Sequence, residues 1–213
     1  MELKLLSSEA LLALYNTELK KAFPAAELKS YAGMERLRSR NAYLPLGVFD
    51  QNDLVGYSLL WGDPKADYLL LDYLGVTEAR RNGGIGAKIL HLLRDTFKDK
   101  SGILGEVESP DGGAEDELRL RRLNFYRRND FTKMDYDCVL FGVLYDTMLL
   151  SPNGKGTDAA AQELHRKLYM DHLPEKIAQR YVSLPRDPNA PPQPLVSQAE
   201  FDCGDDEKKV FSV

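Results

Sequence analysis

The chain has 213 residues, of which 43% are hydrophobic and 29% charged, with a formal net charge of -5. This length allows one domain with a substantial core, and the acidic balance argues against unspecific binding to nucleic acid or anionic membranes. No apolar run is long enough to cross a bilayer and the N-terminus lacks a secretory signal, so we predict a cytoplasmic protein. The only cysteines, Cys138 and Cys203, lie far apart, which predicts neither a disulfide framework nor a metal site.

The N-terminal third of the chain predicts a strand, two helices and a hairpin. Ser7 is a typical cap residue before a helical apolar stripe, and the Asn and Asp residues of 50–53 favour a tight turn between two apolar runs. The predicted elements are an edge strand over 1–6, a helix to about Phe23, a basic amphipathic helix over 27–40, and hairpin strands over 46–49 and 54–61.

A strand, a glycine-rich turn and a helix follow in the centre of the chain. The apolar run over 68–76 predicts a buried strand, and Leu90, Leu93 and Phe97 repeat at helical spacing in a helix predicted from Gly83. Glycines let the backbone approach a ligand closely, and the first N–H groups of a helix lack internal partners. The segment Arg81–Lys88 is therefore a candidate site for a phosphate group.

The remainder of the chain predicts further elements of the same domain and then a tail. Residues 185–213 are rich in proline and acidic residues, so they have too little apolar surface to offset the entropy cost of ordering. We predict a domain over 1–184 and a flexible tail over 185–213. The elements predicted in between are a strand over 103–108, a loop over 109–113, a charged helix over 115–128, strands over 132–141 and 142–150, and a helix over 158–173.

Three kinds of glycine-rich phosphate site compete for the segment around Gly84. A P-loop needs Gly-Lys-Ser/Thr, but Ala87 follows Gly86, and a dinucleotide fingerprint fails because no glycine ends the Gly84-Ile-Gly86 pattern. The pattern that remains is Arg81-x-x-Gly84-x-Gly86 after a strand ending in Leu-Gly-Val. It resembles the pyrophosphate-binding signature of the GNAT superfamily of acyl-CoA-dependent N-acyltransferases.

A second phrase, from Phe125 to Phe131, adds to this resemblance. It is similar to the Phe-Tyr-x-x-x-Gly-Phe phrase of GNAT members, with Asp130 in place of the glycine. The resemblance implies that Tyr126 lies near the sulfur of the cofactor and protonates the departing thiolate. Taken without the glycine pattern, a Tyr after a Phe on an amphipathic helix is more often a core residue with one solvated tip.

The resemblance also implies a fold and a set of cofactor contacts. The expected fold is α/β (α+β), with a mixed, mostly antiparallel sheet that is splayed between its fourth and fifth strands and flanked by helices. A bulge is expected near Leu74 and Gly75, and Arg80 and Arg81 would add positive charge beside the pyrophosphate of acetyl-CoA. The implied cofactor-binding residues are Leu74, Gly75, Val76, Arg81, Asn82, Gly83, Gly84, Ile85, Gly86 and Ala87.

The group that takes the proton from the acceptor is the least defined part of the predicted site. Some GNAT members carry a glutamate on the fourth strand, but the matching residue here is Leu70, with Asp72 nearby as a substitute. On the next strand Glu106 and Glu108 share one face, and burial there would raise a carboxyl pKa toward neutrality. We therefore predict Glu106 and Glu108 as catalytic residues beside Tyr126, with no metal.

The predicted function is an N-acetyltransferase that moves an acetyl group from acetyl-CoA to a primary amine of a small molecule or peptide, by direct transfer in a ternary complex. The alternative is a non-catalytic acyl-CoA-binding or protein-interaction module of the same fold. A third hypothesis is a nucleotide-binding oxidoreductase. The predicted partner is the amine acceptor, with no nucleic acid and no membrane, and homodimerisation is left open.

Overall fold

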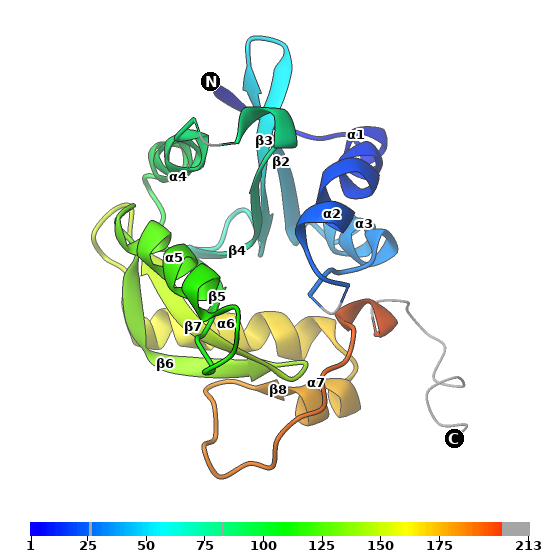
Figure 1. The fold of residues 1–213 in the computed structure, drawn as a ribbon, viewed down its shortest axis with the longest axis vertical. Coiled ribbons are helices and arrows are strands. Elements are labelled where there is room, and N and C mark those ends of the chain that lie inside the picture. The colour runs from blue at the N-terminus through cyan, green and yellow to red at the C-terminus, as the bar shows by residue number, and fades with distance from the viewer. Residues whose placement is uncertain (26, 82, 202–213) are drawn as a thin grey trace.

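A computed structural model describes residues 1–25, 27–81 and 83–201 of the chain. Its centre is an eight-stranded sheet in the order β1-β2-β3-β4-β5-β7-β6-β8 (Figure 1). Neighbouring strands are antiparallel except for β4 and β5, which are parallel. The strands are β1 (Glu2–Leu5), β2 (Tyr43–Asp50), β3 (Asp53–Trp61), β4 (Tyr68–Val76), β5 (Gly102–Glu108), β6 (Thr132–Leu140), β7 (Val143–Leu150) and β8 (Val182–Ser183).

Helices cover both faces of the sheet. The side chain of Ser7 accepts the expected capping hydrogen bond at the start of α1, and Ser30 and Thr157 cap α3 and α6 in the same way. In Figure 1, α4 and α5 lie on one side of the split sheet, and α1 to α3 lie beside β2 and β3 on the other. The helices are α1 (Ser8–Leu14) with a π-helical turn (Tyr15–Leu19), α2 (Lys20–Ala22), α3 (Tyr31–Ser39), α4 (Ile85–Thr96), α5 (Asp116–Arg127), α6 (Asp158–His172) and α7 (Glu175–Tyr181).

The sheet opens between β4 and β5. The two strands pair from Tyr68 with Gly102 to Leu71 with Gly105, and beyond that point no register joins them. The second half of β4 therefore keeps only β3 as a partner strand, so its other edge faces the opening. This arrangement confirms the predicted mixed sheet splayed between its fourth and fifth strands.

The irregularity in β4 lies earlier than predicted. Leu74 and Gly75 pair in regular register with Ser58 and Tyr57, whereas the register shifts between Leu59 and Leu60, so that Asp72 is the extra residue. The expectation of a bulge at Leu74 and Gly75 is wrong in position, because the strand absorbs its extra residue where the Asp72 side chain turns toward buried partners.

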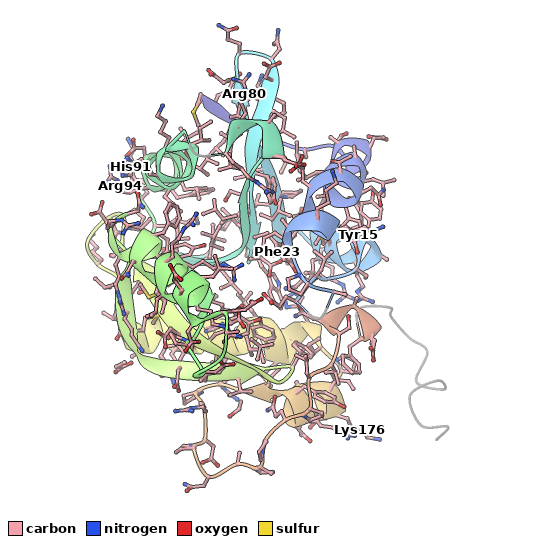
Figure 2. All side chains as sticks on the ribbon, in the orientation of Figure 1. Tyr15, Phe23, Arg80, His91, Arg94 and Lys176 are labelled. Carbon is pink, nitrogen blue, oxygen red and sulfur yellow. The ribbon has the colours of Figure 1, made fainter. Side chains whose placement is uncertain are left out.

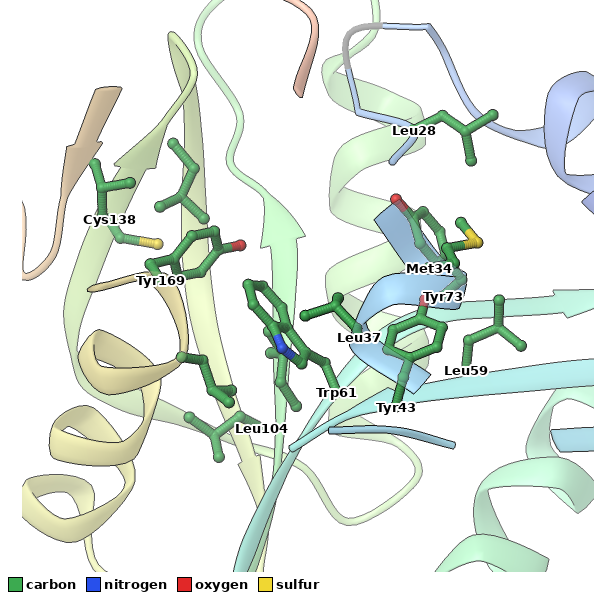
Figure 3. Packing of buried hydrophobic residues seen from close by; sticks show 14 of the residues in the cluster. Leu28, Met34, Leu37, Tyr43, Leu59, Trp61, Tyr73, Leu104, Cys138 and Tyr169 are labelled. Carbon is green, nitrogen blue, oxygen red and sulfur yellow. The ribbon is translucent and has the colours of Figure 1, made fainter. Parts of the chain in front are cut away.

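Two apolar clusters hold the layers together. One joins the sheet to α1, α3 and α6, and the other joins it to α4 and α5. In the first cluster the Trp61 ring meets the Tyr169 ring edge to face, with centroids 5.0 Å apart, as Figure 3 shows. The α6 helix is thereby fixed against β3 beside the opening.

The second predicted helix and the C-terminal part of the chain differ from expectation. The helix begins at Tyr31 and not at residue 27, because Lys29 leaves the helical path to contact β4. Helix α7 was not predicted. The division into a domain and a flexible tail at residue 184 stays a prediction, although residues 194–201 lie against the turn between β6 and β7, where the Val196 N–H donates to Phe141 O. Residues 202–213, including Cys203, are outside the described part of the chain.

Among the described residues, no helix is both long enough and apolar enough to cross a bilayer.

Candidate active site

A cavity of about 350 Å³ occupies the opening between β4 and β5. Its walls come from β4, β5 and α5, from the turn between α2 and α3, and from the C-terminal segment. Phe23, which Figure 2 shows on the inner side of the N-terminal helices, is part of this lining. Predicted site residues that line the cavity are Leu74, Gly75, Val76, Arg81, Glu106, Glu108 and Tyr126.

The free edge of β4 borders the cavity through Leu74, Gly75 and Val76. A Cβ on Gly75 would lie 2.1 Å from the Tyr57 ring, so only glycine allows this ring to pack across the strand. The main-chain groups of this edge have no partner strand and can pair with an extended amide-containing chain. This geometry suits the role that the sequence predicts for the three residues.

The glycine-rich turn lies between β4 and α4. Gly84 precedes the first residue of α4 with φ of 70°, in the left-handed region that favours glycine, and a Cβ there would meet open space. Gly86 is on the first turn of α4 and packs against Phe125. The helix therefore starts at Ile85, and its unpaired N–H groups and positive dipole end are available to an anion. Gly83 is exposed just before this start, Ala87 is on the first turn, and Asn82 is outside the described residues.

The two arginines before this turn have different surroundings. Arg80 pairs with Asp53 at 2.9 Å on the surface (Figure 2), whereas Arg81 lines the cavity. Arg81 is therefore the arginine that can place its charge beside an anion bound there. The predicted contribution of Arg80 has no support in this geometry.

Tyr126 projects from α5 into the cavity. Its ring packs edge to face between Phe125 and Phe131, with centroid distances of 5.3 and 5.1 Å. Burial raises the pKa of Tyr126 to about 12, so the phenol keeps its proton at neutral pH. Asp130, where the GNAT phrase has glycine, has φ of 66°, a left-handed conformation that aspartate tolerates. The substitution thus leaves the turn after Tyr126 intact.

Glu106 reaches the cavity from β5 but is held from the opposite side by α6. Its Oε1 lies 2.6 Å from His165 Nε2 and accepts a hydrogen bond of 2.8 Å from Tyr169 Oη. Burial acts to raise the pKa of Glu106, but the hydrogen bonds with His165 and Tyr169 and the positive charge of Lys29 outweigh it and lower that pKa. The expectation of a raised pKa is therefore wrong for Glu106, because the sequence did not show these partners.

Glu108 faces the same cavity and belongs to a separate network. Arg119 Nη2 lies 2.6 Å from Glu108 Oε1, and Arg122 Nη1 lies 3.5 Å from Oε2. Two arginines from α5 thus neutralise this carboxylate. Glu106 and Glu108 share a face as predicted, but each has its own partners and they do not form a mutually coupled pair.

Asp72 forms a buried ion pair at the floor of the cavity. Lys29 Nζ lies 2.6 Å from Asp72 Oδ1, and Tyr43 Oη donates to Oδ2 at 2.6 Å. The Lys29 ammonium also lies over the Trp61 ring, 4.4 Å from its centroid. Burial raises the pKa of Asp72, while the contacts with Lys29 and Tyr43 act to lower it. The carboxylate is occupied by these partners.

One group of metal-ligating side chains is present among the described residues. The ligand atoms of Glu106, Cys138 and His165 lie within 4.8 Å of one another. His165 Nδ1 is 2.9 Å from Tyr136 Oη while its Nε2 faces Glu106, so both ring nitrogens already have partners. Burial also raises the pKa of the Cys138 thiol, which keeps it protonated. This group is typical of a hydrogen-bonded core.

Comparison with known proteins decides the family. The model of the acetyltransferase (GNAT) family matches residues 8–131, which is more than half of the chain and includes the glycine-rich turn and Tyr126. The chain belongs to the GNAT acetyltransferase family. The predicted family is confirmed, and acetyl-CoA is the cofactor that membership in this family implies.

Curated and solved GNAT relatives agree with this assignment. Over 114 residues the chain is 30% identical to "Putative acetyltransferase YjbC" of Bacillus subtilis, a match that covers 54% of each chain, so this chain spans about half the length of that relative. A structure of a "putative acetyltransferase from GNAT family" of Bacteroides thetaiotaomicron superposes with a TM-score of 0.62 at 22% identity, over 80% of this chain and 97% of the other.

Two further solved structures share the GNAT fold at lower identity. The ribosomal-protein-S18-alanine N-acetyltransferase of Escherichia coli gives a TM-score of 0.53 at 16% identity, over 73% of this chain and 96% of the other. The spermidine N-acetyltransferase of Vibrio cholerae, in complex with CoA and spermine, gives 0.53 at 13% identity, over 72% and 96%. These likenesses confirm the predicted fold.

Several residues of this GNAT cavity were not predicted from the sequence. Glu27 and Lys29 come from the turn before α3, Tyr169 from α6 and Gln198 from the C-terminal segment. The four-residue spacing of His165 and Tyr169 could have placed both on one face of α6. No local signal marks Glu27 or Gln198, because their position depends on contacts between distant parts of the chain.

Proposed function

We propose that this protein is an N-acetyltransferase that moves an acetyl group from acetyl-CoA to a primary amine, by direct transfer with both molecules bound. The observation that carries this proposal is that one cavity is lined by the free edge of β4, Arg81, Tyr126 and several carboxylates. A donor and an acceptor bound in this cavity would meet at the opening between β4 and β5.

The residues present suit each requirement of the transfer. The amine enters as an ammonium ion, gives one proton to a carboxylate of the cavity, and its nitrogen then attacks the thioester carbonyl carbon. A C–N bond forms as the C–S bond breaks, Tyr126 gives its proton to the departing sulfur, and the second proton lost by the nitrogen restores Tyr126. The products are the N-acetyl amine and CoA thiol, and the first proton leaves to solvent. Glu106 and Glu108 stay the sequence-predicted candidates for that first proton.

The names of structural relatives support an amine as acceptor. One acts on the alanine of ribosomal protein S18 and another on spermidine, while a third structure holds an aminoglycoside. For this chain a small-molecule or peptide amine is therefore the proposed acceptor class. The cytoplasmic location and homodimerisation stay predictions.

One observation favours the alternative of a non-catalytic acyl-CoA-binding module. Leu70 stands where some family members carry a glutamate, and Glu106 and Glu108 both have firm partners. Incubation with acetyl-CoA and a panel of monoamines, polyamines, aminoglycosides and peptides, read by mass spectrometry, separates the two hypotheses. Acetylated product supports the enzyme, whereas binding of acetyl-CoA without any product supports the module.

Acetyl-CoA is expected to stabilise the protein against heat. A ligand that binds only the native state adds about 2.7 kcal/mol at a concentration of 100 times its Kd, which is a shift of several degrees in Tm for a protein of this size. Differential scanning fluorimetry with and without acetyl-CoA measures this shift.

A variant of the glycine-rich turn is the control for this prediction. Gly84→Glu puts a carboxylate and a strained left-handed residue at the start of α4, so the variant should lose the Tm shift while keeping a cooperative transition. No shift of the wild-type Tm at saturating acetyl-CoA would contradict cofactor binding at this site.

A further inference from the structure

Four carboxylates line the cavity, and three of them are engaged. Asp72 is paired with Lys29, Glu106 contacts His165 and Tyr169, and Glu108 is neutralised by two arginines of α5. The fourth is Glu27, and within the described part of the chain no hydrogen bond or ion pair reaches its carboxylate. A half-buried carboxylate with no cation in direct contact is costly unless a ligand supplies one.

The backbone that carries Glu27 is held firmly in place. Tyr73 Oη donates to the Glu27 carbonyl oxygen at 2.9 Å and accepts a hydrogen bond of 2.8 Å from the Lys29 N–H. The Glu27 N–H donates to Pro24 O in the preceding turn. One tyrosine of β4 thereby fixes the residues on both sides of Leu28, so that the Glu27 side chain has a defined origin at the cavity wall.

A second polar group faces the same end of the cavity. Gln198 lines the cavity although the residue is only 6% exposed, and the described residues offer no hydrogen-bond partner to its side-chain amide. The Ser197 hydroxyl donates to Ala25 O at 2.8 Å, which brings the C-terminal segment beside the turn that carries Glu27. The half-buried Glu27 and the buried Gln198, which come from opposite ends of the chain, thus line the same cavity.

We propose that Glu27 is the carboxylate that binds the ammonium group of the acceptor and takes its first proton, with Gln198 beside it as a hydrogen-bonding partner of the same acceptor. This inference rests on the proposed acetyltransferase function and names the residue that function requires. The step moves one proton from the R–NH₃⁺ nitrogen to a Glu27 oxygen, leaving R–NH₂ for attack on the thioester, and Glu27 returns this proton to solvent after the product leaves.

The electrostatic surroundings of Glu27 suit this role. Burial raises its pKa, the negative charges of Glu108 and Glu115 raise it further, and Arg119 and Arg122 act to lower it. A carboxylate with a raised pKa is a better proton acceptor than the ordinary one. Because the protonated form no longer attracts the ammonium ion, the KM of the amine should rise as pH falls through this raised pKa.

The test compares Glu27→Gln with wild type, using an amine that the wild-type enzyme acetylates. The neutral side chain has the same shape, so we expect at least a tenfold rise in the KM of the amine and loss of the acidic limb of kcat/KM against pH. The KM of acetyl-CoA and the Tm shift that it causes should not change. Glu27→Asp, which keeps the charge on a shorter side chain, should recover part of the loss.

Glu117→Gln, the same change at an exposed position of α5, is the matched control and should behave as wild type. If Glu27→Gln keeps the KM of the amine within twofold and the same pH profile, the role of Glu27 is refuted while the acetyltransferase function stands. If the wild type neither acetylates any amine of the panel nor binds one by calorimetry in the presence of CoA, both the function and the role of Glu27 fail.

Discussion

Tyr126→Phe is expected to lower the turnover number by about 100-fold or more while leaving the Kd of acetyl-CoA unchanged, since general acid catalysis typically contributes 10²- to 10⁴-fold. The change removes only the hydroxyl, so the ring keeps its packing between Phe125 and Phe131. A thiolate that leaves without a proton donor is the physical reason for the loss. Steady-state kinetics with a verified amine, together with calorimetry for acetyl-CoA, measures both quantities.

The pH profile gives this prediction a second readout. Because the pKa of Tyr126 is raised to about 12, the phenol stays protonated from neutral to moderately alkaline pH, and an alkaline loss of activity due to this group should begin only near that value. Tyr15→Phe makes the same change on the outer side of the N-terminal helices, away from the cavity (Figure 2), and should leave turnover unchanged. Unchanged turnover in Tyr126→Phe would remove its role as the proton donor.

Lys29→Met is expected to cost about 3–5 kcal/mol of unfolding free energy, because it leaves the buried Asp72 carboxylate without its cation. The Lys29 side chain is 3% exposed and that of Asp72 is 4% exposed, so water cannot replace the lost partner. Urea unfolding followed by circular dichroism measures the change. Lys167→Met, which removes an exposed partner of Asp171 on α6, should cost less than about 1 kcal/mol.

The destabilisation of Lys29→Met should depend on pH in a defined direction. The pKa of Asp72 is already raised in the folded protein, and removal of Lys29 raises it further. A folded state that binds protons more tightly than the unfolded state loses stability as pH rises from the unfolded pKa through the folded one. The loss of unfolding free energy relative to wild type should therefore be largest above the pKa that Asp72 has in the folded variant, and it should shrink toward acid pH. A second change, Asp72→Asn, should restore part of the loss at neutral pH, and an equal deficit in the double variant would contradict this account.

Most of the fold could be predicted because local patterns decide it. Alternating and apolar runs indicated the strands, Ser7 caps the first helix, and Asn and Asp residues mark the hairpin turn between β2 and β3. The start of α3 was misplaced because Glu27 to Lys29 have helical composition. The Lys29 N–H donates instead to Tyr73 Oη, and the Lys29 ammonium group binds Asp72; both partners are more than 40 residues away. Such distant contacts override local preference without leaving a local signal.

The candidate site divides in the same way. The cofactor-binding residues could be proposed from the sequence because a glycine-rich turn and the Phe125–Tyr126 phrase are short motifs with a fixed spacing, and their roles stay predictions. The state of each carboxylate could not be predicted, since it depends on the partners of that carboxylate in space. Glu106 is the clearest case, because His165, which is 59 residues away, reverses the direction of its pKa shift together with Lys29 and Tyr169.

The hydrogen bond between Ser197 and Ala25 spans 172 residues, so the wall that holds Gln198 closes only after almost the whole described chain is available. Contacts of such long sequence separation form late, because the entropy cost of closing so large a loop is met before they contribute. During folding, the cavity wall formed by β4 and α5 would therefore be in place before the wall that holds Gln198.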